Sequence, residues 1–269
     1  MRNVPNVIGL TLFGVLGAIA IFAPAPYDPH ERVGTPFQPP SPQHWLGTND
    51  IGQDIFSEII HGTRTSLLVG VLAAGGALLI GTVVGVTAGY AGGVVDAVLM
   101  RLVDVVLVVP FLPLMILLAA YLGPSLVTVI AVIAALTWAR PARVIRSQVL
   151  SLKTLLYVEA AHAVGGGFWY VLRRHIVPAI VPLAMAQLVT VASSAILIES
   201  SLAFLGLGDP VQKSWGTVLY YAQARGAFLT GAWLWWVLPP GMLITLSVLS
   251  FALMGYALEA RANPRLRQH

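Results

Sequence analysis

Long apolar runs restrict the fold of this sequence more than any other feature. A transmembrane helix needs about 20 apolar residues to cross roughly 30 Å of hydrocarbon, and backbone in hydrocarbon satisfies its own hydrogen bonds only in helices or closed barrels. The composition agrees, with 57% hydrophobic and only 10% charged residues. Because an Arg near a helix end can extend to the interface, we expect the fourth run to continue to residue 144. The runs predict an all-α membrane protein with six transmembrane helices, at 7–22, 67–90, 105–122, 126–138, 176–204 and 233–258.

The distribution of basic residues predicts the orientation of these helices. With the N-terminus inside, the inner segments hold eleven of the fifteen Lys and Arg residues. Cytoplasmic loops carry such an excess, so we expect both termini in the cytoplasm and an even number of spans. The inner set comprises Arg2, Arg101, Arg140, Arg143, Arg146, Lys153, Arg173, Arg174, Arg261, Arg265 and Arg267.

The first 64 residues read as one helix followed by an external loop. Residues 2–25 also resemble a cleaved signal peptide, but we interpret them as a retained first helix. Seven prolines between residues 24 and 42 predict an irregular loop. Asp54 then caps a short apolar stretch that is either an interfacial helix or an extension of the second span. Residues 65–269 form the expected core of five helices.

Small residues and prolines indicate how the spans pack. Gly81, Gly85 and Gly89 recur every four residues in the second span, which lets a neighbouring helix approach closely. Pro110 and Pro113 remove backbone donors in the third span and permit a kink there.

The longest inner connection, at about residues 140–178, is too long for a simple turn. It contains Glu159-Ala160-Ala161, then Gly165 and, after ten intervening residues, Ile176-x-Pro178. We expect a short helix over 154–164, a break at the glycine triplet 165–167, and a second helix that enters the fifth span.

This pattern resembles the EAA motif of the inner-membrane subunits of bacterial ATP-binding-cassette importers. Residues 44–54 (HWLGTNDIGQD), 100–104 (MRLVD) and 204–208 (FLGLG) with Trp215-Gly216 are similar to the dipeptide, oligopeptide and nickel permease family. Chain length and the small external loop resemble the shorter, C-type subunit of that family. Gln53 stands where the family usually has Arg, and the glycine triplet is richer in glycine than usual.

The resemblance implies a multi-pass permease subunit of the bacterial inner membrane that hydrolyses nothing itself. It forms half of the path for peptides or related small solutes, and ATP and Mg²⁺ bind to partner ATPases, so this chain needs no cofactor. The implied partners are a second, related permease, two ATPase subunits or domains, an external solute-binding protein and membrane lipid, with no nucleic acid. The residues implied in ATPase coupling are Glu159, Ala160, Ala161, Gly165, Arg173 and Arg174.

Two acidic residues near span ends are further candidates, since ionisable residues in membranes are often functional. Glu199, beside Ser200 and Ser201, either faces the path, as a gate, or caps a helix break. Asp104 lies three residues after Arg101, and we expect an ion pair between them at the inner interface.

Two other classes of protein share parts of this pattern. Gly206-Leu207-Gly208-Asp209 and Tyr27-Asp28 match the two motifs of intramembrane aspartyl proteases, in which paired carboxylates share a proton. Here Asp28 and Asp209 fall in predicted external loops, each before a proline, which disfavours the protease. A passive channel gives no reason for the long inner loop. Without cysteines, a P-loop or a zinc-protease motif, we predict no catalytic and no metal site.

Overall fold

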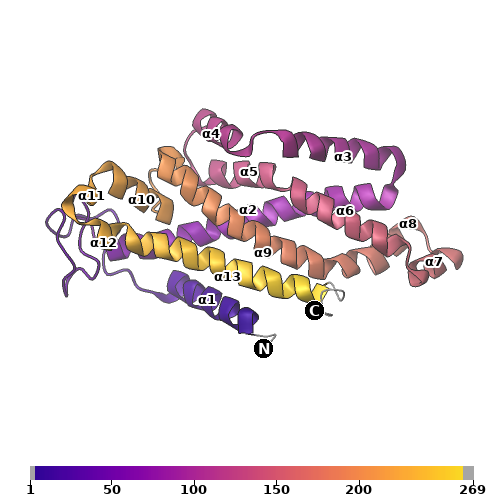
Figure 1. Cartoon of the computed structure of the whole chain (residues 1–269), viewed down its shortest axis with the longest axis horizontal. Coiled ribbons are helices and arrows are strands. Elements are labelled where there is room, and N and C mark those ends of the chain that lie inside the picture. Colours follow the sequence, from indigo (N-terminus) through magenta and orange to yellow (C-terminus); the bar gives the residue numbers. More distant parts are fainter. Residues whose placement is uncertain (1–3, 263–269) are drawn as a thin grey trace.

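Residues 4–262 are described by a computed structural model and form an elongated bundle of helices (Figure 1). Long helices run along the bundle, the short helices α10, α11 and α12 gather at one end, and α7 and α8 lie at the other. The predicted all-α class is confirmed for this part of the chain, where β-pairing is limited to two isolated bridges before α2. Arg2, Arg265 and Arg267 of the inner set lie outside the described residues. The helices are α1 (Val4–Phe22), α2 (Ile55–Ala91), α3 (Gly93–Val108), α4 (Phe111–Leu122), α5 (Leu126–Thr137), α6 (Ala139–Lys153), α7 (Leu156–Ala163), α8 (Phe168–Val171), α9 (Val177–Leu202), α10 (Trp215–Ala224), α11 (Ala227–Thr230), α12 (Trp233–Trp236) and α13 (Leu238–Ala262), with π-helical turns at Leu172–Ile176 and Ala203–Leu207.

Three continuous helices are long and apolar enough to cross a membrane: Ile55–Ala91, Phe168–Phe204 and Trp233–Leu258. Two bent pairs, α3 with α4 and α5 with α6, raise the number of candidate spans to five. The apolar part of α1 is shorter, at 17 residues or fewer. Each of the six predicted runs is therefore helical, but length alone supports three to five of them as spans.

The third run, predicted as one helix over 105–122, is broken, so the prediction of one continuous helix was wrong. α3 begins at Gly93 and ends at Val108, and α4 leaves it at an angle of 85°. Val109 is extended (φ −63°, ψ 133°), as expected for a residue before proline, and Pro110 has no N–H to continue the helix. The kink predicted from Pro110 is therefore a full break.

The apolar stretch after Asp54 is an extension of α2, so the alternative of a separate interfacial helix was wrong. The Asp54 carboxylate accepts a hydrogen bond from Ser57 N at 2.8 Å, as an N-cap does. Ile55 and Ile59 are buried against residues of α10 and Trp236 rather than exposed to lipid. Hydrophobic periodicity fits an interfacial helix and an extension of the second span equally well, and tertiary packing decides for the extension.

The loop before α2 is joined to the segment before α10 by a buried charged cluster. Lys213 Nζ donates to Glu58 Oε1 at 2.6 Å and to Gln53 Oε1 at 3.1 Å. Asn49 Nδ2 donates to the same two oxygens. Lys213 and Glu58 are both at least nine-tenths buried. This charged cluster joins the loop before α2 and the first turn of α2 to the loop before α10, and its members Glu58 and Lys213 lie 155 positions apart in the sequence.

α1 lies along α13, and the start of α1 and the end of α13 are close together in Figure 1. Ser250 Oγ donates to Gly9 O at 2.8 Å, and the rings of Phe13 and Phe251 meet edge to face. At the other end of α1, the guanidinium of Arg64 donates to the carbonyl oxygen of Ala20 at 2.7 Å, which caps the helix C-terminus. α1 is therefore fixed to the bundle at both ends.

The glycine stripe of α2 packs against α6, which confirms the predicted packing surface. A Cβ at Gly81 would lie 2.8 Å from Trp138 O, and one at Gly85 would lie 2.5 Å from Ala142 O. Both distances are too short for a real Cβ atom. Helix backbones thus meet directly, as small-residue stripes permit in membranes.

Replacing Gly85 with alanine is expected to lower the thermal unfolding midpoint of the purified protein. The added methyl group overpacks the α2–α6 contact, which lowers the free energy of unfolding by about 1–3 kcal/mol. Gly75→Ala on the same helix is the control, since a Cβ there meets nothing within 4 Å. Intrinsic fluorescence during heating in detergent measures both. Equal midpoints would contradict the proposed packing.

Candidate coupling helix and translocation groove

The segment predicted as a docking helix is α7, which stands at the end of the bundle opposite α10–α12 (Figure 1). Glu159 and Ala160 are exposed, whereas Ala161 is buried with Val158. Ala161 and Val158 pack into a core that also contains Val149 and Ile176. The EAA residues therefore divide: two face outward, and the third holds α7 on the bundle.

Gly165 ends α7 in a conformation that favours glycine. Its φ is +86°, a left-handed value that costs other L-residues about 1–2 kcal/mol. Gly165 N donates to His162 O, and Gly166 N donates to Ala161 O, both at 2.9 Å. These two bonds form a Schellman motif, which satisfies carbonyls at the helix end. The predicted break at the glycine triplet is confirmed, and the chain re-enters a helix at Phe168.

Large apolar side chains are exposed around α7 and α8. Their exposed fractions range from 47% to 85%. They lie at one end of the molecule, beyond the long central helices (Figure 1). Contiguous exposed apolar surface of this kind marks interaction sites. The residues are Leu156, Tyr157, Val164, Phe168, Trp169 and Tyr170.

Arg173 and Arg174 lie in the π-helical turn that follows α8, and both are exposed. The guanidinium of Arg173 sits 5.6 Å from the centre of the Trp169 ring, a cation–π distance. Arg173 therefore packs on the exposed aromatic surface of α8.

The segment that leads into α7 is tied to its neighbours by charged side chains. Arg146 of α6 forms two hydrogen bonds of 2.5 Å to Asp96 of α3. Lys153 donates to the carbonyl oxygens of Gly89 and Tyr90 at the end of α2, where a positive charge is favourable. α6 is thereby fixed to α2 and α3 just before α7 begins.

The expected pair between Arg101 and Asp104 is corrected by the structure. Asp104 instead accepts from Arg143 of α6, with an N–O distance of 2.6 Å. Spacing along one helix suggested a local partner, but α6 packs alongside α3 and supplies a closer guanidinium. Both side chains of this pair are about half exposed.

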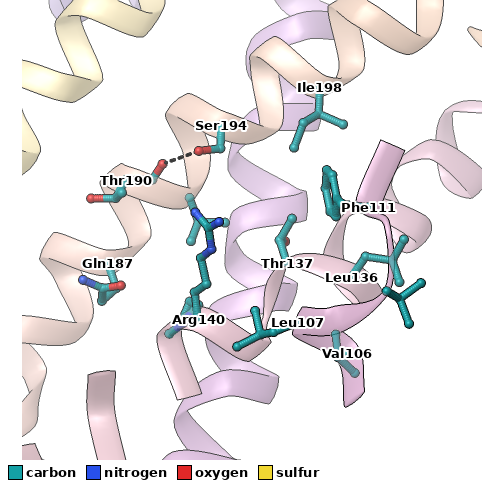
Figure 2. A pocket seen from close by; sticks show the side chains of 13 residues that line it. Val106, Leu107, Phe111, Leu136, Thr137, Arg140, Gln187, Thr190, Ser194 and Ile198 are labelled. Carbon is teal, nitrogen blue, oxygen red and sulfur yellow. Dashed lines mark hydrogen bonds between the residues drawn. The ribbon is translucent and has the colours of Figure 1, made fainter. Parts of the chain in front are cut away.

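A groove of about 330 Å³ opens where both broken helix pairs approach α9. Figure 2 shows Gln187, Thr190 and Ser194 along α9, with the Arg140 side chain extending from α6 towards them. Its other walls include Leu107 and Phe111 beside the α3–α4 break, and Leu136 and Thr137 at the end of α5. Interrupted helices often line sites at membrane depth, because the freed backbone can face a cavity.

Sequence reasoning missed this groove. The signal was present, since residues 187, 190 and 194 are polar and share one helix face within an apolar run. Arg140 was assigned to the inner side from its place in the chain. The structure puts it beside residues near the middle of the 37-residue helix Phe168–Phe204.

Glu199 is buried within the chain, at 5% exposure, where α9 approaches α2. Its carboxylate accepts from Ser66 Oγ at 3.2 Å and from Ser200 Oγ at 3.3 Å. Ser66 Oγ in turn accepts from Trp215 N at 3.2 Å. Glu199 thus joins α2, α9 and the start of α10, just before the π-helical turn that ends α9.

The two aspartates of the protease motifs act as turn caps in separate places. Asp28 accepts from His30 N at 2.8 Å. Asp209 accepts from Leu126 N at 3.0 Å and from Val211 N at 2.9 Å, so it caps the start of α5. Their bonding partners are backbone N–H groups, and neither aspartate lies within a helix. The arrangement gives no support to aspartyl protease chemistry.

Long apolar helices, a polar groove between them and an exposed helix at one end define a membrane transport component. Residues 81–268 match the family described as binding-protein-dependent transport system inner membrane component. The chain belongs to this family, the permease subunits of ATP-binding-cassette importers, and is a transport component rather than an enzyme. The predicted resemblance is confirmed.

Curated relatives align over almost the whole chain. The dipeptide transport system permease protein DppC of Bacillus subtilis (strain 168) is 34% identical over 99% of this chain and 84% of its own length. The oligopeptide transport system permease protein OppC of the same organism is 34% identical over 97% of this chain and 86% of its own length. The glutathione transport system permease protein GsiD of Pectobacterium atrosepticum is 35% identical over 85% of this chain and 75% of its own length.

Asp96→Asn is expected to loosen α3, because it removes a partly buried, doubly bonded partner of Arg146. A loss of about 1 kcal/mol corresponds to roughly fivefold faster amide hydrogen exchange in α3. Asp104→Asn is the control, since its pair with Arg143 is more exposed. Mass spectrometry of exchange over residues 93–108 measures both. Exchange in Asp96→Asn as slow as in the wild-type protein would show that the pair with Arg146 does not hold α3.

Proposed function

We propose that this chain is the transmembrane subunit of a bacterial ATP-driven importer and forms half of its path for peptides or related small solutes. The observation that carries the proposal is the exposed apolar surface around α7, at the end of a bundle that belongs to a transport family. A soluble protein partner would cover that surface. The printed names of the relatives, which refer to dipeptides, oligopeptides and glutathione, support peptides as the solute class.

In the proposed assembly the chain works with three kinds of partner. A second, related permease subunit completes the path, two ATPase subunits or domains bind ATP and Mg²⁺, and an external binding protein delivers the solute. The family's description as binding-protein-dependent supports the last of these. This chain itself needs no cofactor, and neither the channel nor the protease alternative gains a supporting observation.

We propose six spans in the bacterial inner membrane: α1, α2, the α3–α4 pair, the α5–α6 pair, α9 and α13. The neighbouring start of α1 and end of α13 support an even number (Figure 1). Both lie away from α10–α12, as expected if the termini are cytoplasmic and α10–α12 external. The boundary predicted after residue 64 would cut α2, so in this proposal the first span with its external loop ends at Asp54 and the core of five spans begins with α2 at Ile55.

Coupling is proposed to run through the loop at residues 140–178. Glu159, Ala160, Arg173 and Arg174 face the ATPase, while Ala161 and Gly165 keep α7 in its shape and position. ATP-driven closure of the ATPases would displace α7. Because α7 connects to α6 before it and to α9 after it, the displacement would reach both walls of the groove. Glu199, buried beside Ser66, would hold the outer end of α9 as a gate element.

Affinity purification from the native membrane in mild detergent tests the assembly directly. We expect recovery of a second permease, a P-loop ATPase and a binding protein, identified by mass spectrometry. Recovery of this chain alone across several detergents would overturn the importer and favour a channel.

Gly165→Val is expected to reduce ATP-driven peptide uptake about tenfold, because the strain at positive φ displaces α7 from its docked position. Gly167→Val is the matched control: Gly167 has a φ of −68°, and a Cβ there meets nothing within 4 Å. Replacing the exposed Glu159 by Trp should weaken coupling in the same way.

Uptake and ATP hydrolysis are measured on the complex in proteoliposomes, with membrane insertion checked for each variant. Coupling through α7 predicts a lower ratio of uptake to hydrolysis at normal insertion. Unchanged uptake in both the Gly165 and Glu159 variants would refute the docking role.

A further inference from the structure

We propose that Arg140 makes the groove a carboxylate-binding site for the solute, so that this chain itself selects acidic or zwitterionic cargo. The inference rests on the proposed function and deepens it, since it assigns the solute's carboxylate a position within the path. Arg140 lies outside the sequence motifs described above. It is singled out by its position in the groove (Figure 2).

The depth of Arg140 is the first argument. It lines the groove with Gln187 and Thr190, which lie near the middle of the helix Phe168–Phe204. A guanidinium at this depth is costly unless it faces water or an anion, and such residues mark solute pathways. The Arg140 side chain is exposed at the surface of this chain and extends towards the polar face of α9 (Figure 2).

The lack of an internal partner is the second argument. Arg143 and Arg146, on the same helix, pair with Asp104 and Asp96. Among residues 6–258, whose side chains the structure describes, Arg140 forms no ion pair, and none of the groove-lining residues is acidic. Its charge is therefore available to an anion that enters the groove.

The neighbouring hydroxyl groups complement a zwitterion. Thr137 donates to Ile133 O at 2.7 Å, Thr190 to Ala186 O at 3.0 Å, and Ser194 to Thr190 O at 3.3 Å. Since each hydroxyl proton is used within its own helix, the oxygen lone pairs remain as acceptors. The groove thus offers one cationic donor and several neutral acceptors, which suits a carboxylate joined to amide N–H or ammonium groups.

The walls and size of the groove fit a small, variable solute. A volume of about 330 Å³ lies at the lower end of small-molecule sites. Phe111, Leu136 and Ile198 provide apolar surface without further charge. A planar guanidinium binds a carboxylate through two parallel hydrogen bonds, so recognition of this shared group leaves the solute's side chains free to vary.

Saturation-transfer NMR on the purified complex without ATP tests the site directly, with L-alanyl-L-alanine and its C-terminal amide as probes. We expect transfer to the acid to exceed transfer to the amide in the wild-type protein. Arg140→Gln should reduce transfer to the acid about tenfold, as for loss of a charge-assisted pair, and Arg140→Lys should restore part of it. Arg101→Gln, which changes an exposed arginine of α3 outside the groove, should behave as wild type.

Three outcomes would overturn the inference. They are no transfer to the acid in the wild-type protein, equal transfer to acid and amide, or an unchanged preference for the acid in Arg140→Gln. Loss of the second permease subunit from Arg140→Gln would also overturn it, since Arg140 would then pair with that subunit. Because the measurement needs neither ATP nor a binding protein, failure of the importer assignment appears separately, as absence of an ATPase from the purified complex.

Discussion

The direct contact between the backbones of α2 and α6 is the constraint on which the rest of this structure depends. Gly81, Gly85 and Gly89 leave no room for a side chain between the two helices. In a bilayer, lipid tails are as apolar as the helix surfaces, so close van der Waals packing largely replaces the hydrophobic effect as the force between helices. This contact fixes α6 on the longest helix of the protein, and everything attached to α6 is placed by it.

α6 connects the groove to α7. Arg140 stands at its start beside the groove, and Lys153 lies at its end, three residues before α7 begins. The pairs with Asp96 and Asp104 add α3 to the same unit. A displacement applied at α7 would therefore be carried by a braced helix rather than a flexible loop. The opposite wall, α9, joins α7 through α8 and a π-helical turn, so both sides of the groove connect to the same exposed helix.

Hydrophobic periodicity and motif spacing predicted the elements whose cause is local. The α7 helix, the break at Gly165 and the glycine stripe were readable because each follows from a few neighbouring residues. Elements that depend on tertiary contact were not. The 85° break at Pro110, the pairing of Asp104 with Arg143, and the extension of α2 to Ile55 are decided by what packs against them. The groove was missed because its residues come from three separate parts of the chain. The neighbours of Arg140 on α9 were not predicted because they depend on how α6 lies against α9.

The charged cluster of Lys213, Glu58, Gln53 and Asn49 limits which side chains the loop before α2 can accept. The positive charge beside Glu58 comes from Lys213, in the loop before α10, and Gln53 adds a neutral acceptor. An arginine at position 53 would therefore place a second buried cation beside Lys213. A chimera that takes the loop before α2 from a relative with Arg at position 53 would have this defect. Exchange of that loop is compatible with this fold only when the loop before α10 is exchanged with it.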